Sequence, residues 1–200
     1  MLFVITGPSG AGKSVLVRRV MENLESVEFS VSCTTREKRN DEIEGKDYYF
    51  VSEEEFKEMI NASKLAEWAV VHGNYYGTSK EELETKGAKG DLLLDLDIQG
   101  AQQIKQKFKE AVFVFIMPPL FQELEKRLIA RGQENAVSIQ KRLEVASKEI
   151  AYYDQFDYVV INDELEKAVS ELESIIKSTG YRLEARKAEI QPILRSFTKS

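Results

Sequence analysis

The stretch LFVITGPSGAGKS, residues 2–14, joins a short apolar run to a turn rich in glycine. Residues 7–14 match the pattern G-x-x-x-x-G-K-[ST], which in nucleotide-binding loops follows a strand and opens a helix. Both flanks agree with that setting, because the sequence predicts a strand over Leu2–Thr6 and an amphipathic helix from about Lys13. The alternative is an ordinary glycine turn with a solvated lysine, and it does not account for this placement.

The residue types of this loop suit a bound polyphosphate. Glycines let successive backbone N–H groups turn inward, and the following helix adds its positive end and its unpaired N–H groups. Lys13 brings a cation to the β and γ phosphates, while the hydroxyl of Ser14 is a ligand for Mg²⁺. The predicted nucleoside triphosphate site is made by Gly7, Pro8, Ser9, Gly10, Ala11, Gly12, Lys13 and Ser14.

The composition of the chain limits the kind of protein, its location and its partners. The chain has 200 residues, is 42% hydrophobic and carries a net charge of −6, which favours one globular domain over disorder. The negative charge argues against a nucleic-acid or membrane surface, and the longest apolar run, Ala111–Met117, is too short to span a bilayer. A single cysteine fits a reducing cytosol, and motif-like sequence from Phe3 leaves no room for a targeting peptide. We expect a cytoplasmic protein with small-molecule partners, and composition leaves its oligomeric state open.

Strands and helices alternate over most of the chain. Near-continuous apolar strands separated by helices indicate an α/β fold, a P-loop parallel sheet covered by helices on both faces. The predicted strands are Leu2–Thr6, Phe29–Ser32, Asp91–Asp97, Val112–Ile116 and Tyr158–Ile161. The first predicted helix starts near Lys13, and three more cover Gln99–Phe108, Leu120–Arg131 and Val137–Tyr153. A last helix is predicted to begin at a cap formed by Asn162-Asp163 and to end at about Ser178.

Residues 33–90 break this alternation and predict an inserted unit of mixed α/β structure. They contain strand-like runs at Asp47–Val51 and Leu65–Val71. Capping-box patterns at Ser52–Glu55 and Ser79–Glu82 each predict the start of a short helix.

Two clusters in this unit carry chemistry of their own. Arg36 and Arg39 lie three residues apart with tyrosines nearby, and such arginines bind a phosphate dianion through charge-assisted hydrogen bonds. A solvated loop of mixed charge explains them as well. Glu67 and Trp68 lie in an apolar run, where the ordinary interpretation is a strand's polar face and a core residue. His72 has no second histidine as partner, so we expect it to cap an element or face solvent.

Five motifs, in order, resemble the guanylate kinase family. They are SCTTREKR at 32–39, GKDYYFVS at 45–52, EWA at 67–69, GNYYGTS at 73–79 and LDLDIQG at 94–100. Further matches are PP at 118–119, RLIARG at 127–132, KRL at 141–143 and VIND at 160–163. The resemblance spans about residues 2–176, nearly the whole chain.

The resemblance implies transfer of a phosphoryl group from ATP to GMP, with dGMP as a second acceptor, giving ADP and GDP in purine nucleotide metabolism with Mg²⁺ required. It implies a core of 1–32, 86–125 and 146–200, a GMP-binding insertion at 33–85 and a helical lid at 126–145. The implied GMP ligands are Ser32, Arg36, Arg39, Tyr48, Glu67, Tyr76, Thr78, Asp95 and Asp97. The implied ATP ligands are the loop residues 7–14, Arg127 and Asn162. The implied catalytic residues are Lys13, Arg131 and Arg142. The implied Mg²⁺ ligands are Ser14 and, through water, Asp97.

In this scheme Glu67 reads the base, assisted by Ser32 and Thr78. Guanine presents N1–H and an exocyclic amine side by side, which one carboxylate accepts together, whereas adenine presents a lone pair at N1. A buried carboxylate left unpaired costs several kcal/mol, enough for roughly 10³-fold rejection. Glu67 therefore separates this family from the rival enzyme class, P-loop kinases that act on other nucleoside monophosphates.

Other interpretations stay open for some residues. Asp95 and Asp97 also suit strand-end caps, and Arg127 and Arg142 suit ion pairs on a helix surface. The rival from another class is a scaffold module that binds a phosphorylated segment, but such modules lack an intact phosphate loop. The basic tail Tyr181–Ser200 has helical character, and surface packing and subunit contact fit it equally.

The sequence departs from the family pattern at three places. Asn40-Asp41-Glu42 follows the second arginine where many members have Pro-Gly, so the resemblance does not imply a conformation for that loop. Val15 replaces a common threonine. Leu120 replaces a common serine, which weakens the cap of the following helix.

Overall fold

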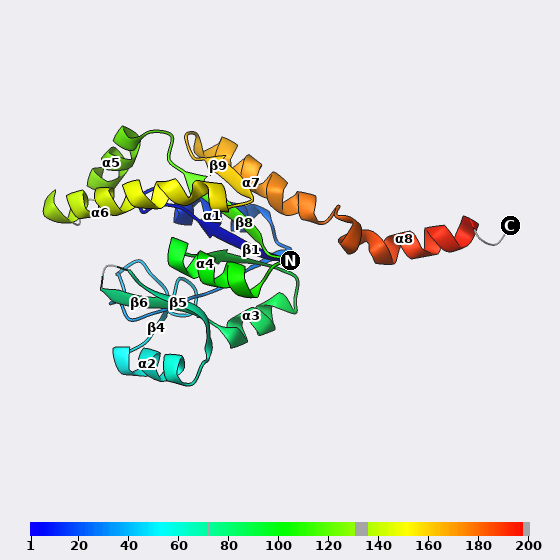
Figure 1. Ribbon diagram of the computed structural model, residues 1–200, viewed down its shortest axis with the longest axis horizontal. Coiled ribbons are helices and arrows are strands. Elements are labelled where there is room, and N and C mark those ends of the chain that lie inside the picture. The colour runs from blue at the N-terminus through cyan, green and yellow to red at the C-terminus, as the bar shows by residue number, and fades with distance from the viewer. Residues whose placement is uncertain (72, 131–135, 198–200) are drawn as a thin grey trace.

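The computed structural model describes residues 1–71, 73–130 and 136–197, whose strands form two sheets (Figure 1). Within these ranges the larger sheet has five strands in the order β2-β7-β1-β8-β9, and every neighbouring pair is parallel. They are β1 (Leu2–Thr6), β2 (Val27–Phe29), β7 (Asp91–Asp95), β8 (Val112–Met117) and β9 (Tyr158–Ile161). The predicted parallel α/β fold is confirmed.

Helices cover both faces of this sheet because the side chains of each strand alternate between two buried layers. Phe3 and Ile5 pack with α1 (Lys13–Asn23) and α7 (Leu165–Thr179). Val4 packs with α4 (Ile98–Lys107) on the opposite face. Since β1 lies in the middle of the sheet, the loop after it opens at the centre of the carboxyl edge, where open α/β sheets bind ligands.

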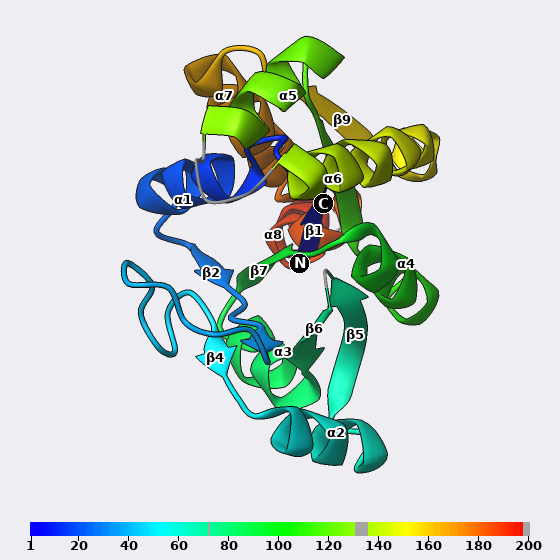
Figure 2. The same ribbon diagram turned by 90° about the vertical axis from the view of Figure 1, so that its left-hand side faces the viewer.

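The predicted insertion contains the smaller sheet, in the order β4-β3-β6-β5, which lies beside the larger one in Figure 2. Its elements are β3 (Cys33–Thr34), β4 (Tyr49–Phe50), α2 (Glu53–Asn61), β5 (Leu65–Val71) and β6 (Asn74–Ser79). β5 and β6 form an antiparallel hairpin, and Phe56 of α2 packs with Cys33 and Leu65 beneath it. α3 (Lys80–Gly87) then returns the chain to β7.

The remaining helical segments follow β8. They are α5 (Phe121–Ala130), α6 (Ala136–Glu149), the 3₁₀ helix η1 (Ile150–Gln155) and α8 (Leu183–Phe197). α8 extends away from both sheets in Figure 1, and Phe197 at its end is 77% exposed. Among the described residues, no helix combines the length and the apolar character needed to cross a membrane.

Several boundaries differ from the prediction, among them the end of β7, which stops at Asp95 and not at Asp97. β2 covers Val27–Phe29 and not Phe29–Ser32, because Val27 is buried and pairs with Asp91 at the start of β7. The apolar residues at 27, 29 and 31 alternate, so the pattern alone leaves the start of the strand open. The helix predicted to reach Tyr153 changes to η1 at Ile150.

Two predicted caps also differ. α7 is capped at Glu164 with no side-chain hydrogen bond, so the cap predicted at Asn162-Asp163 is wrong. The pattern Ser79–Glu82 forms half of a capping box: Ser79 Oγ accepts the Glu82 N–H, but the Glu82 carboxylate accepts the N–H of Val31. In both cases the side chain expected to cap the helix makes a hydrogen bond to a distant part of the chain: Asn162 bonds to Ala11, and Glu82 bonds to Val31.

The capping box that opens α2 is complete and is a local test of the fold. Ser52 Oγ accepts the Glu55 N–H at 3.1 Å, and Glu55 Oε2 accepts the Ser52 N–H at 2.7 Å. We expect Ser52→Ala to lower the free energy of unfolding by about 1 kcal/mol, and the melting temperature by roughly 2–4 °C. Ser52→Thr keeps the acceptor oxygen and is the control; equal melting temperatures for Ser52→Ala and wild type would contradict the cap.

Candidate functional site

Glycine sets the shape of the loop between β1 and α1. Gly12 has φ +88°, a left-handed conformation that glycine adopts without steric cost, and it caps α1. A Cβ on Gly7 would lie 2.2 Å from the carbonyl oxygen of Ile116 in β8. The predicted phosphate loop is therefore a tight turn against β8 that leads directly into the N-terminus of a helix.

Lys13 and Ser14 meet Asp95 at the carboxyl edge of the larger sheet. Lys13 Nζ lies 3.5 Å from Asp95 Oδ1 and 3.3 Å from the carbonyl oxygen of Gly7. Ser14 Oγ donates to Asp95 Oδ2 at 3.3 Å. Because β1 and β7 are neighbours and Asp95 pairs with Ile5, the strand order itself brings this carboxylate to the loop.

The pair of Ser14 and Asp95 suits Mg²⁺. A hydroxyl and a carboxylate are hard oxygen donors, and Mg²⁺ takes one or two protein carboxylates while substrate phosphates and waters complete its shell. Asp97, predicted as a ligand through water, caps α4: its Oδ1 accepts the Gly100 N–H at 2.8 Å. In the part of the chain that the structure describes, no group of three His, Cys, Asp or Glu side chains gathers to hold a metal.

Two side chains of α6 hold Ser9 of the loop. Arg142 donates to Ser9 Oγ from Nη2 at 2.6 Å and from Nε at 3.2 Å, and the Ser9 N–H donates to Glu149 Oε2 at 3.3 Å. Burial raises the pKa of Glu149, although the bond from Ser9 and the charge of Lys13 act to lower it. Sequence reasoning missed Glu149; the available signal was its spacing of seven from Arg142, which puts both on one helix face.

Arg127 and Asn162 contact the loop from α5 and from the end of β9. Arg127 Nη2 donates to the carbonyl oxygen of Asn162 at 2.9 Å, and Asn162 Nδ2 donates to that of Ala11 at 2.8 Å. Both residues predicted to bind ATP thus lie against the loop. Arg131, predicted to be catalytic, and His72 lie outside the described residues.

A cationic cluster forms around Arg36 in the smaller sheet. Arg36 Nε donates to Tyr76 Oη at 3.2 Å, and the guanidinium carbon lies 5.4 Å from the centroid of the Tyr48 ring. The two tyrosine rings meet edge to face at 5.9 Å. Three of the residues predicted to bind the GMP phosphate therefore lie together, while the side chain of the fourth, Arg39, is exposed nearby.

Glu42, which sequence reasoning passed over, binds this cluster. Its two carboxylate oxygens accept from Arg36 Nη2 at 2.7 Å and Nη1 at 3.0 Å, and one also accepts the Arg39 N–H at 2.9 Å. This pairing raises the pKa of Arg36. Burial acts to raise the pKa of Glu42, but the bonds from both arginines lower it overall. The signal was an acid three residues after Arg39, which a solvated loop of mixed charge would show as well.

Glu67 is buried on β5, with 3% of its surface exposed. It accepts hydrogen bonds from Thr78, whose Oγ1 lies 3.3 Å from Ser32 Oγ, so the three residues predicted to read guanine form one chain of contacts. Among the described atoms, Glu67 Oε1 has no hydrogen-bond partner. Burial raises the pKa of Glu67 to about 7, and the charge of Asp97 adds to the shift.

The clusters belong to one site. Burial is the main cause of the raised pKa of Tyr48, and the charge of Asp95 is the next largest. The Asp97 charge acts on Glu67, and the charges of Lys13 and Asp97 both act on Glu149. Electrostatic interactions therefore link Asp95 to the cationic cluster, and link Asp97 both to the buried carboxylate of Glu67 and, together with Lys13, to Glu149.

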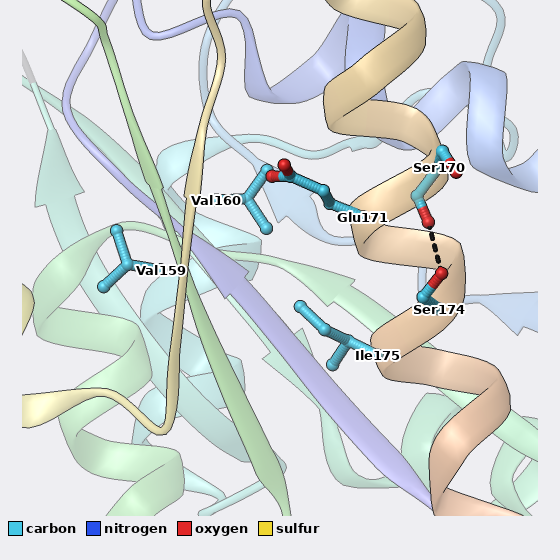
Figure 3. A pocket seen from close by; sticks show the side chains of 6 residues that line it. All are labelled: Val159, Val160, Ser170, Glu171, Ser174 and Ile175. Atoms are coloured by element: carbon cyan, nitrogen blue, oxygen red, sulfur yellow. Dashed lines mark hydrogen bonds between the residues drawn. The ribbon is translucent and has the colours of Figure 1, made fainter.

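A groove between β9 and α7 lies apart from these residues (Figure 3). It is lined by Val159, Val160, Ser170, Glu171, Ser174 and Ile175. Ser174 Oγ donates to the carbonyl oxygen of Ser170 within α7. None of the lining residues was predicted to bind substrate, so the groove forms no part of the candidate site.

Known proteins resemble this chain over most of its length. A family model described as Guanylate kinase matches residues 1–179. Guanylate kinases of Thermotoga maritima and Geobacter sulfurreducens are 43% and 47% identical to it, covering 95% and 88% of this chain and 92% and 87% of theirs. A crystal structure of guanylate kinase from Anaplasma phagocytophilum aligns with a TM-score of 0.76 at 32% identity, covering 92% of this chain and 87% of that one.

The raised pKa of Glu67 makes stability depend on pH. Its pKa rises from 4.5 to about 7 on folding, so between these pH values the folded chain binds more protons than the unfolded chain. The free energy of unfolding therefore falls as pH rises through that window, by on the order of 3 kcal/mol at most. We expect Glu67→Gln to gain stability relative to wild type between pH 5 and pH 8, measured by urea unfolding.

Glu58→Gln is the control, because Glu58 is exposed on α2 and its variant should differ from wild type by the same amount at both pH values. If the stability difference between Glu67→Gln and wild type is the same at pH 5 and pH 8, burial does not raise the pKa of Glu67.

Proposed function

The chain belongs to the guanylate kinase family, and we propose from that premise that it transfers the γ-phosphoryl group of ATP to GMP, giving ADP and GDP. dGMP is a second acceptor, and Mg²⁺ is required. The reaction serves purine nucleotide metabolism in the cytoplasm, where the reducing environment suits a chain with the single, buried cysteine Cys33.

One observation carries the choice of acceptor, the buried carboxylate of Glu67 with its open Oε1. Guanine fills this position with two donors, N1–H and the 2-amino group, and so removes the cost of leaving a buried acceptor unpaired. Adenine offers a lone pair at N1 and uracil an N–H flanked by carbonyls, so neither supplies two adjacent donors. Thr78 and Ser32 hold the carboxylate in place and complete the contacts to the base.

The GMP phosphate binds the cluster of Arg36, Tyr48 and Tyr76, and exposed Arg39 closes on it. A phosphate dianion offers Arg36 the same bidentate geometry that the Glu42 carboxylate uses. Two phosphate oxygens therefore replace the two carboxylate oxygens of Glu42 on Arg36. Glu42 then keeps only its hydrogen bond from the Arg39 N–H.

The ATP phosphates bind the N–H groups of the loop at residues 7–14 and the side chain of Lys13. Arg142 releases Ser9 and turns to the γ-phosphate, while Arg127 and Asn162 flank the nucleotide from their places against Ala11. Mg²⁺, when bound at Ser14 and Asp95, supplies charge neutralisation at the β and γ phosphates.

The reaction needs no general base. The attacking phosphate oxygen is already anionic, so the chain's part is to align two nucleotides and to neutralise charge. Lys13 and the arginines of α5 and α6 stabilise the charge on the transferring group. Closure over both nucleotides excludes water that would otherwise hydrolyse ATP.

A coupled assay of ADP release, with GMP, dGMP, AMP, UMP and CMP as acceptors, tests the proposal. GMP and dGMP should support turnover, and kcat/KM for AMP, UMP and CMP should be lower by about 10³-fold. In Glu67→Gln the preference for GMP over AMP should fall by about 10²-fold, because an amide donates to adenine N1 as readily as it accepts from guanine. Glu58→Gln is the matched control, and an unchanged preference in Glu67→Gln would contradict base reading by this carboxylate.

The role of the phosphate loop has its own test. Lys13→Ala should lower kcat by about 10³-fold, since it removes a cation aimed at the developing charge. The melting temperature and the affinity for GMP, measured by calorimetry, should stay near the wild-type values. Lys57→Ala, on the exposed face of α2, controls for loss of a lysine. Near-normal turnover of Lys13→Ala would refute the assignment of the loop.

A further inference from the structure

The strand that carries Glu67 is an outer strand held by a helix of the core. β5 ends the order β4-β3-β6-β5, so among residues 1–71, 73–130 and 136–197 no strand pairs with its outer edge. An edge strand presents backbone N–H and C=O groups that need partners. Helix α4, which begins at the carboxyl edge of the larger sheet, lies along β5 in both views (Figures 1 and 2).

Side chains of α4 supply the missing backbone partners. Gln103 Nε2 donates to the carbonyl oxygen of Trp68 at 2.6 Å, and Gln103 Oε1 accepts the Trp68 N–H at 3.2 Å. One side-chain amide thus makes with Trp68 the two bonds that a neighbouring strand would make. Lys107 Nζ donates to the carbonyl oxygen of Ala66. These two anchors fall on either side of Glu67.

A third residue of the same helix face contacts Glu67 itself. A Cβ on Gly100 would lie 2.5 Å from Glu67 Oε2, so the absence of a side chain there lets the carboxylate approach the helix. Residues 100, 103 and 107 share one face because they are spaced by three and four. We call Gly100, Gln103 and Lys107 the β5 clamp.

The position of Glu67 depends on an irregularity in β5. Leu65 pairs with Ser79 and Glu67 with Thr78, so Ala66 is an extra residue that bulges from the ladder. Leu65 packs with Phe56 beneath the smaller sheet, whereas Ala66 packs with the core cluster on the other side. The bulge lets Ala66 and the next residue, Glu67, both face the core. Without it the alternation of a strand would turn Glu67 away from the site.

We propose that Gln103 is a positioning residue for purine selection: with Gly100 and Lys107 it fixes the bulge of β5 against α4 and so aims the Glu67 carboxylate at the base. This inference rests on the proposed function, because it assumes that Glu67 reads guanine. It adds a determinant of specificity that touches neither nucleotide.

The test compares two glutamines on adjacent positions of α4. Gln103→Met keeps length and helix propensity but removes both bonds to Trp68, whereas Gln102→Met removes a bond to Gln155 on the other side of the helix. Each variant is assayed with GMP and with inosine monophosphate, which keeps N1–H but lacks the 2-amino group. We expect the ratio of kcat/KM for GMP over inosine monophosphate to fall about tenfold in Gln103→Met, mainly through KM for GMP.

Gln102→Met should stay within twofold of wild type in that ratio, with a similar melting temperature. The inference is overturned if Gln103→Met keeps the wild-type ratio, if both variants lose it equally, or if kcat falls alike for both acceptors. Gly100→Ala is the second variant. Its added methyl group should lower the ratio with Gln103 intact, and a folded Gly100→Ala with wild-type selectivity counts against the clamp.

Hydrogen exchange at the Trp68 amide, followed by NMR without nucleotide, separates this inference from the proposed function. The amide should exchange at least tenfold faster in Gln103→Met than in wild type or Gln102→Met, because it loses its acceptor. Unchanged exchange refutes the clamp whatever the enzyme phosphorylates. If the wild-type protein does not phosphorylate GMP, the proposed function is wrong. The proposed role of the clamp in purine selection is then also wrong, even if the Trp68 amide exchanges faster in Gln103→Met.

Discussion

A carboxylate taken out of water must find donors or give up its charge, and Glu67 brings that constraint to the centre of the site. Thr78 satisfies part of it, and burial raises the pKa of the remaining acid to about 7. A partner with two adjacent donors resolves the rest. Specificity then follows from the cost of an unmet hydrogen bond and does not require a close steric fit. Contacts surround Glu67, from Thr78 and Ser32 on one side to Gly100 on the other, and hold that acceptor in place.

Strand order explains why residues far apart in the chain meet there. Placing β7 beside β1 brings Asp95 to Lys13 and Ser14, and placing β8 and β9 on the other side brings Asn162 to Ala11. Parallel strands end at one edge, so every loop that follows them opens on the same space. The insertion leaves the core after β2 and returns at β7, so the smaller sheet lies beside the larger one.

Local patterns predicted those parts of the molecule that local physics determines. The loop at 7–14, the strand Leu65–Val71 and the capping box at Ser52 follow from residue types within a few positions, and each is seen in the structure. The cap predicted at Asn162 failed because its amide bonds Ala11, 151 residues earlier in the chain. A local preference of about 1 kcal/mol gives way to such a buried contact.

The residues that sequence reasoning missed share a different character. Glu42, Glu149 and Gln103 are ordinary surface residue types whose patterns suit a solvated loop or helix. Their roles arise from partners in other elements: Arg36 for the first, Ser9 for the second and Trp68 for the third. The spacing of Glu149 from Arg142 and of Glu42 from Arg39 does not separate these roles from an ordinary solvated helix or loop. The partners can be identified only once the positions of the two sheets are known.

The clamp on β5 also constrains how the two halves of the site approach each other. A helix is stiff, and α4 carries Asp97 at its cap, Gly100 against Glu67 and Gln103 against the next residue of β5. The base-reading edge of the smaller sheet is therefore joined to the core. Arg36 and Tyr48 of the cationic cluster flank β3 and β4, away from the β5 edge, and near them Arg18 of α1 makes a long, partly exposed ion pair with Asp47. The smaller sheet is thus attached to the core unevenly, by three closely packed α4 residues at its β5 edge and by a 4.0 Å ion pair at the side of the cationic cluster, so the position of Glu67 is fixed more firmly than that of the arginines.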